Sequence, residues 1–361
     1  METSLEATWC LGFVRTLGVE FDLSLMGTAL EAVSERTHAL SSLGVDGFFA
    51  AEGPHDIFAP LYLAAAGSPG AALMTNAAIA FPRNPIHLAH AAWDLQRLSR
   101  GHFRLGIAPQ VRAHITRRFG LEWSSPVDRM ADLVDALHAI FATFQEGAAL
   151  EHEGPFYRHT LMTPMFNPGP LPGGAPPVIL GALGPVMTAL GASRADGLSV
   201  LPFCSEELLR GSTLPAIEKG LAAAGRDRSM IEVVCGAIVG VGSNDDELRD
   251  AEAGARALLG FYGSTPAYRR VLASIGREDA AGPLSAAVRA GEFGQLGALV
   301  DDHMVDRLAI VGTPEVVADR LLERFGWLAD RIALFLPSEP TDETLGLLMR
   351  HLHGAKSARL R

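Results

Sequence analysis

The feature that most constrains this chain is the alternation of short apolar runs with longer amphipathic stretches. Residues 47–51, 103–108 and 231–241 are typical of strands buried on both faces, because polar side chains do not alternate regularly along them. Residues 128–145 instead carry apolar side chains at helical spacing. This alternation predicts parallel strands connected by helices rather than an antiparallel meander.

The remaining elements repeat the same order. Further strands are predicted at 9–14, 71–80, 178–180, 197–201 and 331–336, and further helices at 28–43, 86–99, 206–224, 245–259, 314–325 and 342–353. Roughly eight such units fit a closed (β/α)₈ barrel. An open doubly wound sheet is the alternative, but it would carry G-x-G-x-x-G after its first strand, and none follows residues 9–14. We therefore predict an α/β fold, a single TIM-barrel domain over residues 1–361.

Two segments interrupt the repeat. Residues 146–177 are rich in Gly and Pro and are predicted to form a hairpin at 150–157 followed by a long loop. Residues 262–311 are predicted to be a mixed, partly helical insertion. Loops of this length in a compact domain are usually functional or interfacial, so we expect both segments to shape a substrate pocket.

Charge and cysteine content exclude several classes of protein. With 30 basic and 41 acidic residues, the net charge of −11 argues against nucleic-acid or anionic-membrane partners. The three cysteines are odd in number and far apart, so they indicate neither a disulfide framework nor a zinc site. No apolar stretch approaches the ~20 residues of a membrane span, and the N-terminus does not resemble a signal peptide. We expect a soluble, cytoplasmic protein.

The loop after the second predicted strand carries the candidate acid–base residues. In a (β/α)₈ barrel the chemistry lies where each strand ends, and Glu52 and His55 follow the strand at 47–51. Imidazole titrates near neutrality, so His55 is a candidate general acid or base. The alternative for His55 is a solvated loop residue, and Glu52 is either catalytic or anchors the loop by accepting backbone N–H bonds.

The loop after the fifth predicted strand is a candidate phosphate site. It consists of Gly181, Ala182, Leu183, Gly184 and Pro185, with a helix expected to begin near Val186. Free backbone N–H groups at a helix N-terminus suit a phosphate group, and proline is well placed in the first helical turn. The alternative is a purely structural turn.

A basic run follows the fourth predicted strand and comprises Arg112, His114, Arg117 and Arg118. Arg112 and His114 are candidates for contacting an anionic substrate or cofactor tail, with a solvated helix face as the alternative. His87 and His90 share a helix face without a third ligand, so no metal site is predicted. The absence of a P-loop, a G-x-S-x-G elbow and an H-E-x-x-H motif favours cofactor chemistry.

Several longer segments together resemble a known family. They are the stretches at 43–47, 92–99, 101–106, 154–164, 184–185, 195–197 and 261–268. On these segments the chain resembles the luciferase-like monooxygenase superfamily, and more closely its branch of coenzyme F420-dependent oxidoreductases. The resemblance extends from about residue 29 to residue 336.

The resemblance implies a barrel whose mouth holds a flavin-like ring. It implies a cis peptide between Asn76 and Ala77, after Thr75 in the third strand, that bulges against the ring. It also places the phosphate-bearing tail of the cofactor at the ends of the fourth and fifth strands. The residues implied there are Ala108, Pro109 and Gln110, together with the segment from Gly181 to Pro185.

The chain also departs from the sugar-phosphate dehydrogenases of this superfamily. Glu52 matches the Asp of their Asp-His pair, but Gly53 stands where the His would be, with His55 two residues further on. Gln110 and Val111 replace their Gly-Glu pair, which removes the catalytic acid of that chemistry. The resemblance therefore implies a cofactor without implying a substrate.

The resulting prediction is hydride transfer between F420 and an unidentified small organic substrate, with His55 as the proton donor or acceptor. One alternative is an FMN-dependent monooxygenase on the same fold. Another is a catalytically silent barrel that acts as a binding partner. A homodimer is expected through helices near the second and third strands, where residues 57–66 are notably apolar.

Overall fold

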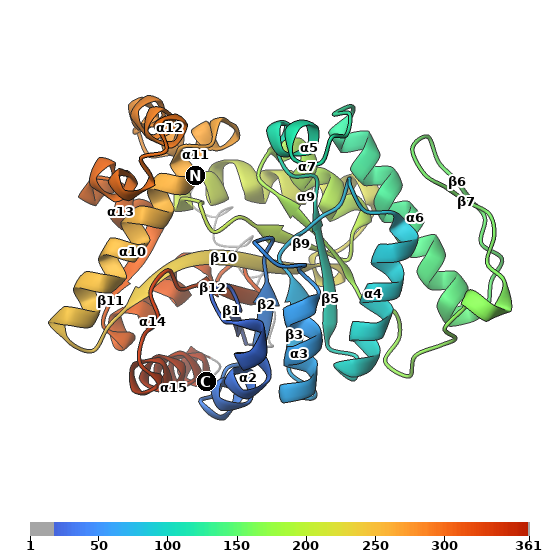
Figure 1. The fold of residues 1–361 in the computed structure, drawn as a ribbon, viewed down its shortest axis with the longest axis horizontal. Coiled ribbons are helices and arrows are strands. Elements are labelled where there is room, and N and C mark those ends of the chain that lie inside the picture. Colours follow the sequence, from blue (N-terminus) through green and yellow to red (C-terminus); the bar gives the residue numbers. More distant parts are fainter. Residues whose placement is uncertain (1–17, 360–361) are drawn as a thin grey trace, which may run out of the picture.

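A computed structural model describes the backbone of residues 18–359 and the side chains of residues 18–355. Eight parallel strands of this part of the chain close a ring, because the last strand is hydrogen-bonded to the first (Figure 1). In ring order they are β1 Glu20–Ser24, β2 Gly47–Ala50, β3 Ala72–Thr75, β5 Phe103–Ala108, β8 Val178–Ala182, β9 Gly197–Val200, β10 Glu232–Val241 and β12 Arg331–Phe335. The predicted barrel is confirmed.

Helices surround this ring (Figure 1). The longer ones are α2 Val33–Ser42, α3 Ala59–Gly67, α4 Pro85–Leu98, α6 Pro126–Glu146, α7 Pro185–Arg194, α9 Leu214–Ala224, α10 Asp245–Gly263, α14 Pro314–Phe325 and α15 Asp342–Arg359. Local sequence explains where they begin: Asn84 caps α4 by accepting a hydrogen bond from the Ile86 N–H at 2.9 Å, and Pro85 follows it at the first helical position. These bounds agree with the predicted helices to within a few residues at most ends.

The first strand of the barrel is not the predicted one. The predicted strand at 9–14 lies outside the described residues, and β1 occupies the first place in the ring. The hydrophobic pattern does not indicate β1, because Glu20 and Asp22 interrupt its apolar residues with charged ones. Asp22 is nevertheless 2% exposed, since its carboxylate is paired with the buried Arg331 inside the barrel.

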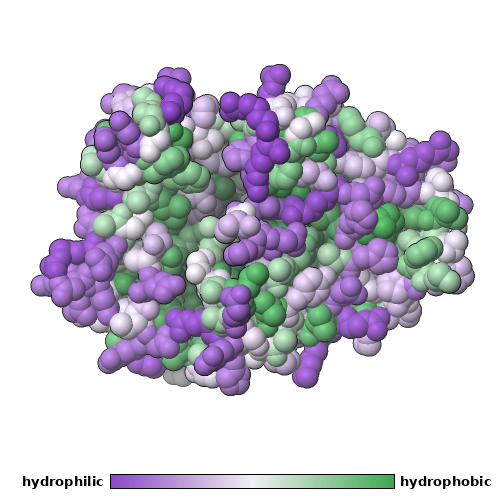
Figure 2. Space-filling view, viewed as in Figure 1, coloured by the Kyte–Doolittle hydropathy of each residue, from purple (hydrophilic) through white to green (hydrophobic). Residues whose placement is uncertain are grey.

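The segment at 146–177 forms the predicted hairpin, slightly further along the sequence than predicted. Its strands are β6 His152–Glu153 and β7 Arg158–His159, so the second strand lies just beyond the predicted range of 150–157. Asp132 of α6 fixes the hairpin by accepting hydrogen bonds from the Phe156 and Tyr157 N–H groups. Figure 2 shows apolar side chains gathered at this end of the molecule, and the exposed apolar residues of the segment are Phe156, Leu161, Met165 and Phe166.

The segment at 262–311 is largely helical, whereas a mixed, partly helical insertion was predicted, and its helices gather beside α10 (Figure 1). They are η5 Pro266–Tyr268, α11 Arg269–Ser274, η6 Glu278–Ala280, α12 Ala281–Ala290, η7 Phe293–Leu299 and α13 Asp302–Leu308. The range ends in a strand that the sequence analysis missed, β11 Ala309–Gly312, which pairs in parallel with β10. Its four residues are too few to separate a strand from a turn by pattern alone.

The barrel interior is layered because alternate residues of each strand point inward. Two ion pairs fill the end where the strands begin: Arg331 with Asp22, and Arg104 with Glu232 at 2.5 Å. Apolar side chains form the next layer, consisting of Phe49, Met74, Ile179, Val234, Ala333 and Phe335. The interior is therefore packed below the C-terminal ends of the strands, where the candidate site lies.

Candidate active site

The centre of the site is a break in the third strand. The Asn76–Ala77 peptide is cis, as the family resemblance implied, and the strand resumes as β4 Ala78–Ile79. Thr75 Oγ1 donates a hydrogen bond to the Gly106 carbonyl oxygen at 2.7 Å. A Cβ on Gly106 would lie 1.8 Å from the Thr75 carbonyl oxygen, so only glycine fits on β5 beside this break.

Ser199 of β9 holds the Asn76 side chain across the barrel. Its hydroxyl donates to Asn76 Oδ1 at 2.6 Å, and Ser199 is buried. The sequence analysis missed this residue. The available signal was a hydroxyl within the otherwise apolar strand Gly197–Val200, since a buried polar group needs a partner.

Three small residues form a floor between neighbouring strands at the barrel mouth. A Cβ built on Gly181 would lie 3.2 Å from the Cβ of Ala108 and 3.6 Å from that of Ala77. The structure therefore brings together three of the predicted cofactor residues from β3–β4, β5 and β8. We name this set, Ala77, Ala108 and Gly181, the small-residue floor. No side chain of this set extends beyond Cβ.

The loop after β5 turns sharply beside this floor. Gln110 has a positive φ of 66°, a conformation that non-glycine residues adopt infrequently, and its Oε1 accepts a hydrogen bond from the Val111 N–H at 2.9 Å. Ala108, Pro109 and Gln110 are each partly exposed, so this predicted part of the cofactor site is accessible.

The predicted phosphate loop ends in a helix N-terminus. β8 ends at Ala182, Leu183 follows it, Gly184 caps α7, and Pro185 is the first helical residue, one position before the predicted start. The guanidinium Nη1 of Arg270 lies 3.2 Å from where a Cβ on Gly184 would be. Backbone N–H groups in the first turn of α7 are left without helical partners, as at any helix start.

Glu52 is engaged as an anchor. Its Oε1 accepts hydrogen bonds from the Ile79 N–H at 2.8 Å and from Arg83 at 2.5 Å, and its side chain is 12% exposed. These contacts tie the loop after β2 to the strand beyond the cis peptide, which is the anchoring alternative of the sequence analysis. Gly53, next along this loop, is partly exposed.

His55 lies exposed on the same loop. Among residues 18–355, no hydrogen bond or ion pair orients its imidazole. The neighbouring Asp56 instead accepts a hydrogen bond from the Phe58 N–H and lies 3.6 Å from Arg83. His55 thus lies at the C-terminal face of the barrel, without a carboxylate partner in the described part of the chain.

The predicted basic run lies on a short helix after β5. Arg112 and His114 belong to α5 Arg112–Arg117, and both side chains are exposed to solvent. Nothing in the described structure connects either side chain to the small-residue floor.

An aromatic cluster that the sequence analysis missed stands after β9. Phe203 stacks on Tyr262 with ring centroids 5.7 Å apart, and Tyr268 lies within 6.4 Å of Phe203. Burial raises the pKa of both tyrosines, so their hydroxyls stay protonated near neutral pH. Phe203 follows the barrel strand β9 and both tyrosines come from the segment at 262–311, so the cluster joins that segment to the C-terminal face of the barrel. Contacts between such distant segments leave no local sequence signal.

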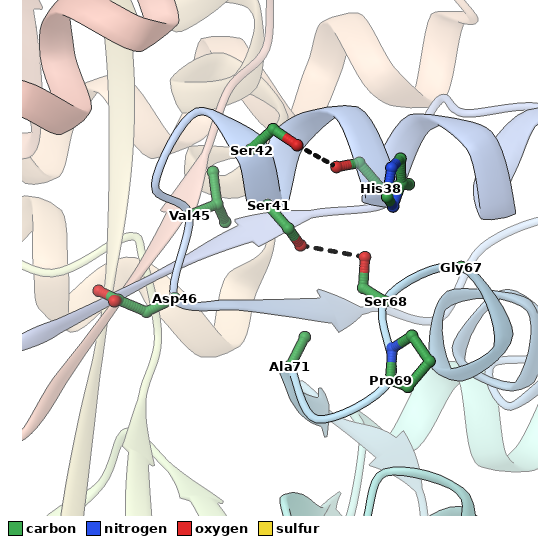
Figure 3. Close-up of a pocket in the computed structure, with 9 residues that line it drawn as sticks. All are labelled: His38, Ser41, Ser42, Val45, Asp46, Gly67, Ser68, Pro69 and Ala71. Carbon is green, nitrogen blue, oxygen red and sulfur yellow. Dashed lines mark hydrogen bonds between the residues drawn. The ribbon is translucent and has the colours of Figure 1, made fainter.

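A separate hollow lies at the opposite face of the barrel (Figure 3). It measures about 410 Å³ and lies among α2, the loop before β2 and the loop before β3. Ser41 and Ser68 are joined across it by a 3.0 Å hydrogen bond. Because it adjoins the starts of β2 and β3, it lies on the face that stabilises a barrel rather than the face that carries chemistry. The described residues contain no group of three metal-binding side chains.

Comparison with known proteins assigns the chain to a family. The sequence model described as "Luciferase-like monooxygenase" matches residues 14–331, and the chain belongs to that family. An uncharacterized protein of Mycobacterium tuberculosis is 42% identical over 303 residues, which is 84% of this chain and 89% of the relative. The 5,10-methylenetetrahydromethanopterin reductase of Archaeoglobus fulgidus is 31% identical, over 66% of this chain and 70% of the relative.

Solved structures agree with this assignment. The coenzyme F420-dependent tetrahydromethanopterin reductase from Methanopyrus kandleri superposes with a TM-score of 0.80 at 19% identity, covering 94% of this chain and 99% of that one. The FMN complex of 3,6-diketocamphane monooxygenase from Pseudomonas putida superposes with a TM-score of 0.65 at 16% identity, covering 92% and 97%. These likenesses show a luciferase-like TIM barrel. No helix among residues 18–359 has the length and apolar character needed to cross a membrane.

Proposed function

We propose that this protein is an F420-dependent oxidoreductase that transfers a hydride between the deazaflavin and a small organic substrate. The observation that carries the proposal is the small-residue floor beside the glycine-capped start of α7. A floor without side chains beyond Cβ accommodates a flat ring, and a helix N-terminus suits the phosphate of the tail. The bound deazaflavin would supply the hydride chemistry.

The residues of this chain would bind and orient. Ala77, Ala108 and Gly181 would support the ring, and the backbone from Gly181 to Pro185, with Ala108, Pro109 and Gln110, would face the tail. The Asn76–Ser199 hydrogen bond would keep the strand break in place while the ligand binds. The segments at 146–177 and 262–311 would cover the mouth and exclude water from the reacting atoms.

Proton transfer is assigned to His55, and Glu52 is assigned an anchoring role. His55 is exposed at the strand ends and its imidazole has no competing partner in residues 18–355, so it is free to meet a substrate. Glu52 is hydrogen-bonded to a backbone N–H and to Arg83, which makes it a positioning residue. Arg112 and His114 remain candidates for an anionic substrate group.

F420 is preferred to FMN because of the named relatives. The Archaeoglobus relative is a 5,10-methylenetetrahydromethanopterin reductase, and a protein of Mycobacterium tuberculosis, 26% identical over 77% of this chain, is named as a putative coenzyme F420-dependent oxidoreductase. FMN-dependent oxygen activation on the same floor is the second candidate, since a structural relative binds FMN.

The homodimer stays a prediction, and burial within the single chain bears on the stretch at 57–66 that was expected to form its interface. Residues 57–66 are apolar, but Ile57, Leu61, Ala64 and Ala65 are buried within the single chain. Core packing therefore accounts for these four apolar side chains, while Tyr62, Leu63 and Ala66 keep part of their surface exposed. The proposed dimer and the proposed cytoplasmic location are tested by the molecular mass of the purified protein and by cell fractionation.

Parallel titrations with F420 and with FMN test the proposal. We expect saturable binding of F420 and weaker binding of FMN, both measured on the same preparation by the change in cofactor fluorescence. Tight FMN binding without F420 binding would replace the proposal with the monooxygenase alternative. Binding of neither cofactor would favour the catalytically silent barrel.

A further inference from the structure

The β6–β7 hairpin is attached to α6 through one buried carboxylate (Figure 1). Asp132 of α6 is 5% exposed, and its Oδ2 accepts hydrogen bonds from the N–H groups of Phe156 at 2.6 Å and Tyr157 at 2.8 Å. In an ordinary four-residue turn the last N–H bonds to the carbonyl of the first residue. Here the Tyr157 N–H is bonded to α6 instead. The hairpin turn, residues 154–157, therefore depends on Asp132.

Two histidines lie opposite each other on this hairpin. His152 and His159 are paired in the β6–β7 ladder, and the Cβ atoms of opposed residues are about 5 Å apart. His152 Nε2 donates a hydrogen bond to Asp132 Oδ1 at 2.8 Å, because a carboxylate only accepts. His159 Nε2 is buried and has no hydrogen-bond partner in residues 18–355. Both oxygens of Asp132 are engaged, so His159 has no carboxylate of its own in that part of the chain.

A proton on His159 would lack compensation while the hairpin is attached. Burial, and after it the charge of His152, lowers the pKa of His159 below 6.5, although Asp132 acts in the opposite direction. Glu153 and Arg158 flank this pair on the hairpin, but both are exposed and bonded to each other. In a released hairpin the imidazole would regain its ordinary pKa of 6.5. The attached hairpin binds the proton more weakly, so acid favours the released one.

The hairpin turn is also connected to the barrel mouth. Arg129 of α6 donates from Nε to the Tyr157 hydroxyl and from Nη2 to the Phe81 carbonyl oxygen, each at 3.2 Å. Its guanidinium carbon lies 4.5 Å from the centre of the Phe81 ring. Phe81 follows β4, the strand that resumes beyond the cis peptide, by two residues. The attached hairpin therefore fixes Arg129 on the segment that leaves the centre of the candidate site.

We propose that acid releases this hairpin, because protonation of His159 detaches residues 154–157 from Asp132. Release also separates Tyr157 from Arg129 beside the barrel mouth. Attachment is at full strength above pH 6.5 and weakens as the pH falls toward the lower pKa of the attached state. One proton is involved, so the equilibrium between the two states shifts by at most about tenfold at pH 5.5. This regulation goes beyond the proposed function and needs no bound cofactor.

Hydrogen exchange of one backbone amide tests the proposal. The chain has four tyrosines, so ¹⁵N-tyrosine labelling gives four amide signals, and Tyr157→Phe identifies one by its loss. We expect protection of the Tyr157 amide, corrected for the intrinsic pH dependence of exchange, to fall severalfold between pH 7.5 and pH 5.5, with about tenfold as the limit. The Tyr62 N–H, bonded to the Phe58 carbonyl oxygen at 3.0 Å, is the internal control and should keep its protection.

Four substitutions assign the pH dependence to one side chain. His159→Gln and His159→Leu remove the titrating group, so the Tyr157 amide should be equally protected at both pH values. His152→Gln keeps a donor for Asp132 and should retain the pH dependence of wild type. His87→Gln, at an exposed position of α4, is the matched surface control and should also retain it. Thermal unfolding at both pH values confirms that each variant is folded, and the two His159 variants serve as replacements for each other.

Constant protection of the Tyr157 amide in wild type would overturn the proposal. So would a pH dependence that persists in the folded His159 variants, or one that disappears in His152→Gln, since the titrating group would then be another. All of these measurements use the protein without cofactor. Their outcome is therefore independent of whether F420 binds, and the failure of this proposal is distinguishable from the failure of the proposed function.

Discussion

Replacing Arg331 with methionine tests whether the ion pairs at the base of the barrel hold the ring closed. Arg331 and Asp22 are each 2% exposed, and two hydrogen bonds of 2.8 Å and 2.5 Å join them across the β12–β1 pairing that closes the ring. Removing one partner of a buried pair costs about 3–5 kcal/mol, because the other charge is left without compensation. That is a large part of a typical folding free energy of about 5–15 kcal/mol.

Urea unfolding of wild type and Arg331→Met measures this loss. Burial raises the pKa of the Asp22 carboxyl, so without Arg331 the folded protein would keep a proton on Asp22 that the unfolded chain releases. The difference in unfolding free energy between wild type and Arg331→Met should therefore grow as the pH rises above 3.8, the ordinary pKa of the carboxyl. Asp22→Asn in the same variant should recover part of the loss.

Arg249→Met is the control for Arg331→Met. Arg249 forms an exposed pair with Asp246 on α10, so its replacement should change the unfolding free energy by no more than about 0.5 kcal/mol. A loss below about 1 kcal/mol in Arg331→Met, or a loss equal to that of the control, would refute the reasoning.

Three further predictions concern the packing beside the site, the buried cysteines and the Asp196 carboxylate. Gly106→Ala should lower the unfolding free energy by about 1–3 kcal/mol and weaken cofactor binding, since its Cβ would meet the Thr75 carbonyl oxygen; Gly282→Ala, which meets no atom within 4 Å, is the control. Burial raises the pKa of the Cys204 thiol to about 12 and raises that of the Cys235 thiol as well. A Cys10→Ser variant should therefore react with a thiol reagent only after it is unfolded. Reaction of the folded variant would contradict this burial. Burial opposes ionisation of Asp196, but hydrogen bonds from His138 and the Val178 N–H lower its pKa overall. The stability that this carboxylate contributes is therefore fully present above pH 3.8, and it is lost as the pH falls through the lower pKa of the folded state. The urea unfolding midpoints of wild type and Asp196→Asn should therefore converge in acid.

The regular part of the barrel was readable from the sequence because its signals are local. The strand at 103–108 and the helix at 314–325 have the predicted bounds, since each combines an unbroken pattern with a clear turn at its ends. β1 could not be predicted, because a buried Asp22 is stable only when paired with Arg331, a residue more than three hundred positions away. β11 was hidden by its length within a helical segment.

The candidate site was predictable where it follows single loops. The cis peptide and the glycine-capped helix came from contiguous segments, one through the family resemblance and the other through turn chemistry. Ser199 was missed, because its role depends on Asn76, which it meets only through the closed ring. Glu52 was recognised with two alternatives, and only its contacts with Ile79 and Arg83 distinguished them.

The most direct test of the proposed cofactor site is the affinity for F420 of a variant that fills the small-residue floor. In Gly181→Leu the new side chain would begin 3.2 Å from Ala108 and occupy the space proposed for the ring. Gly282→Leu, on the exposed face of α12, is the matched control for adding the same side chain. The account predicts that F420 binds wild type and the control alike and that binding to folded Gly181→Leu is lost. Unchanged F420 affinity in Gly181→Leu would contradict it.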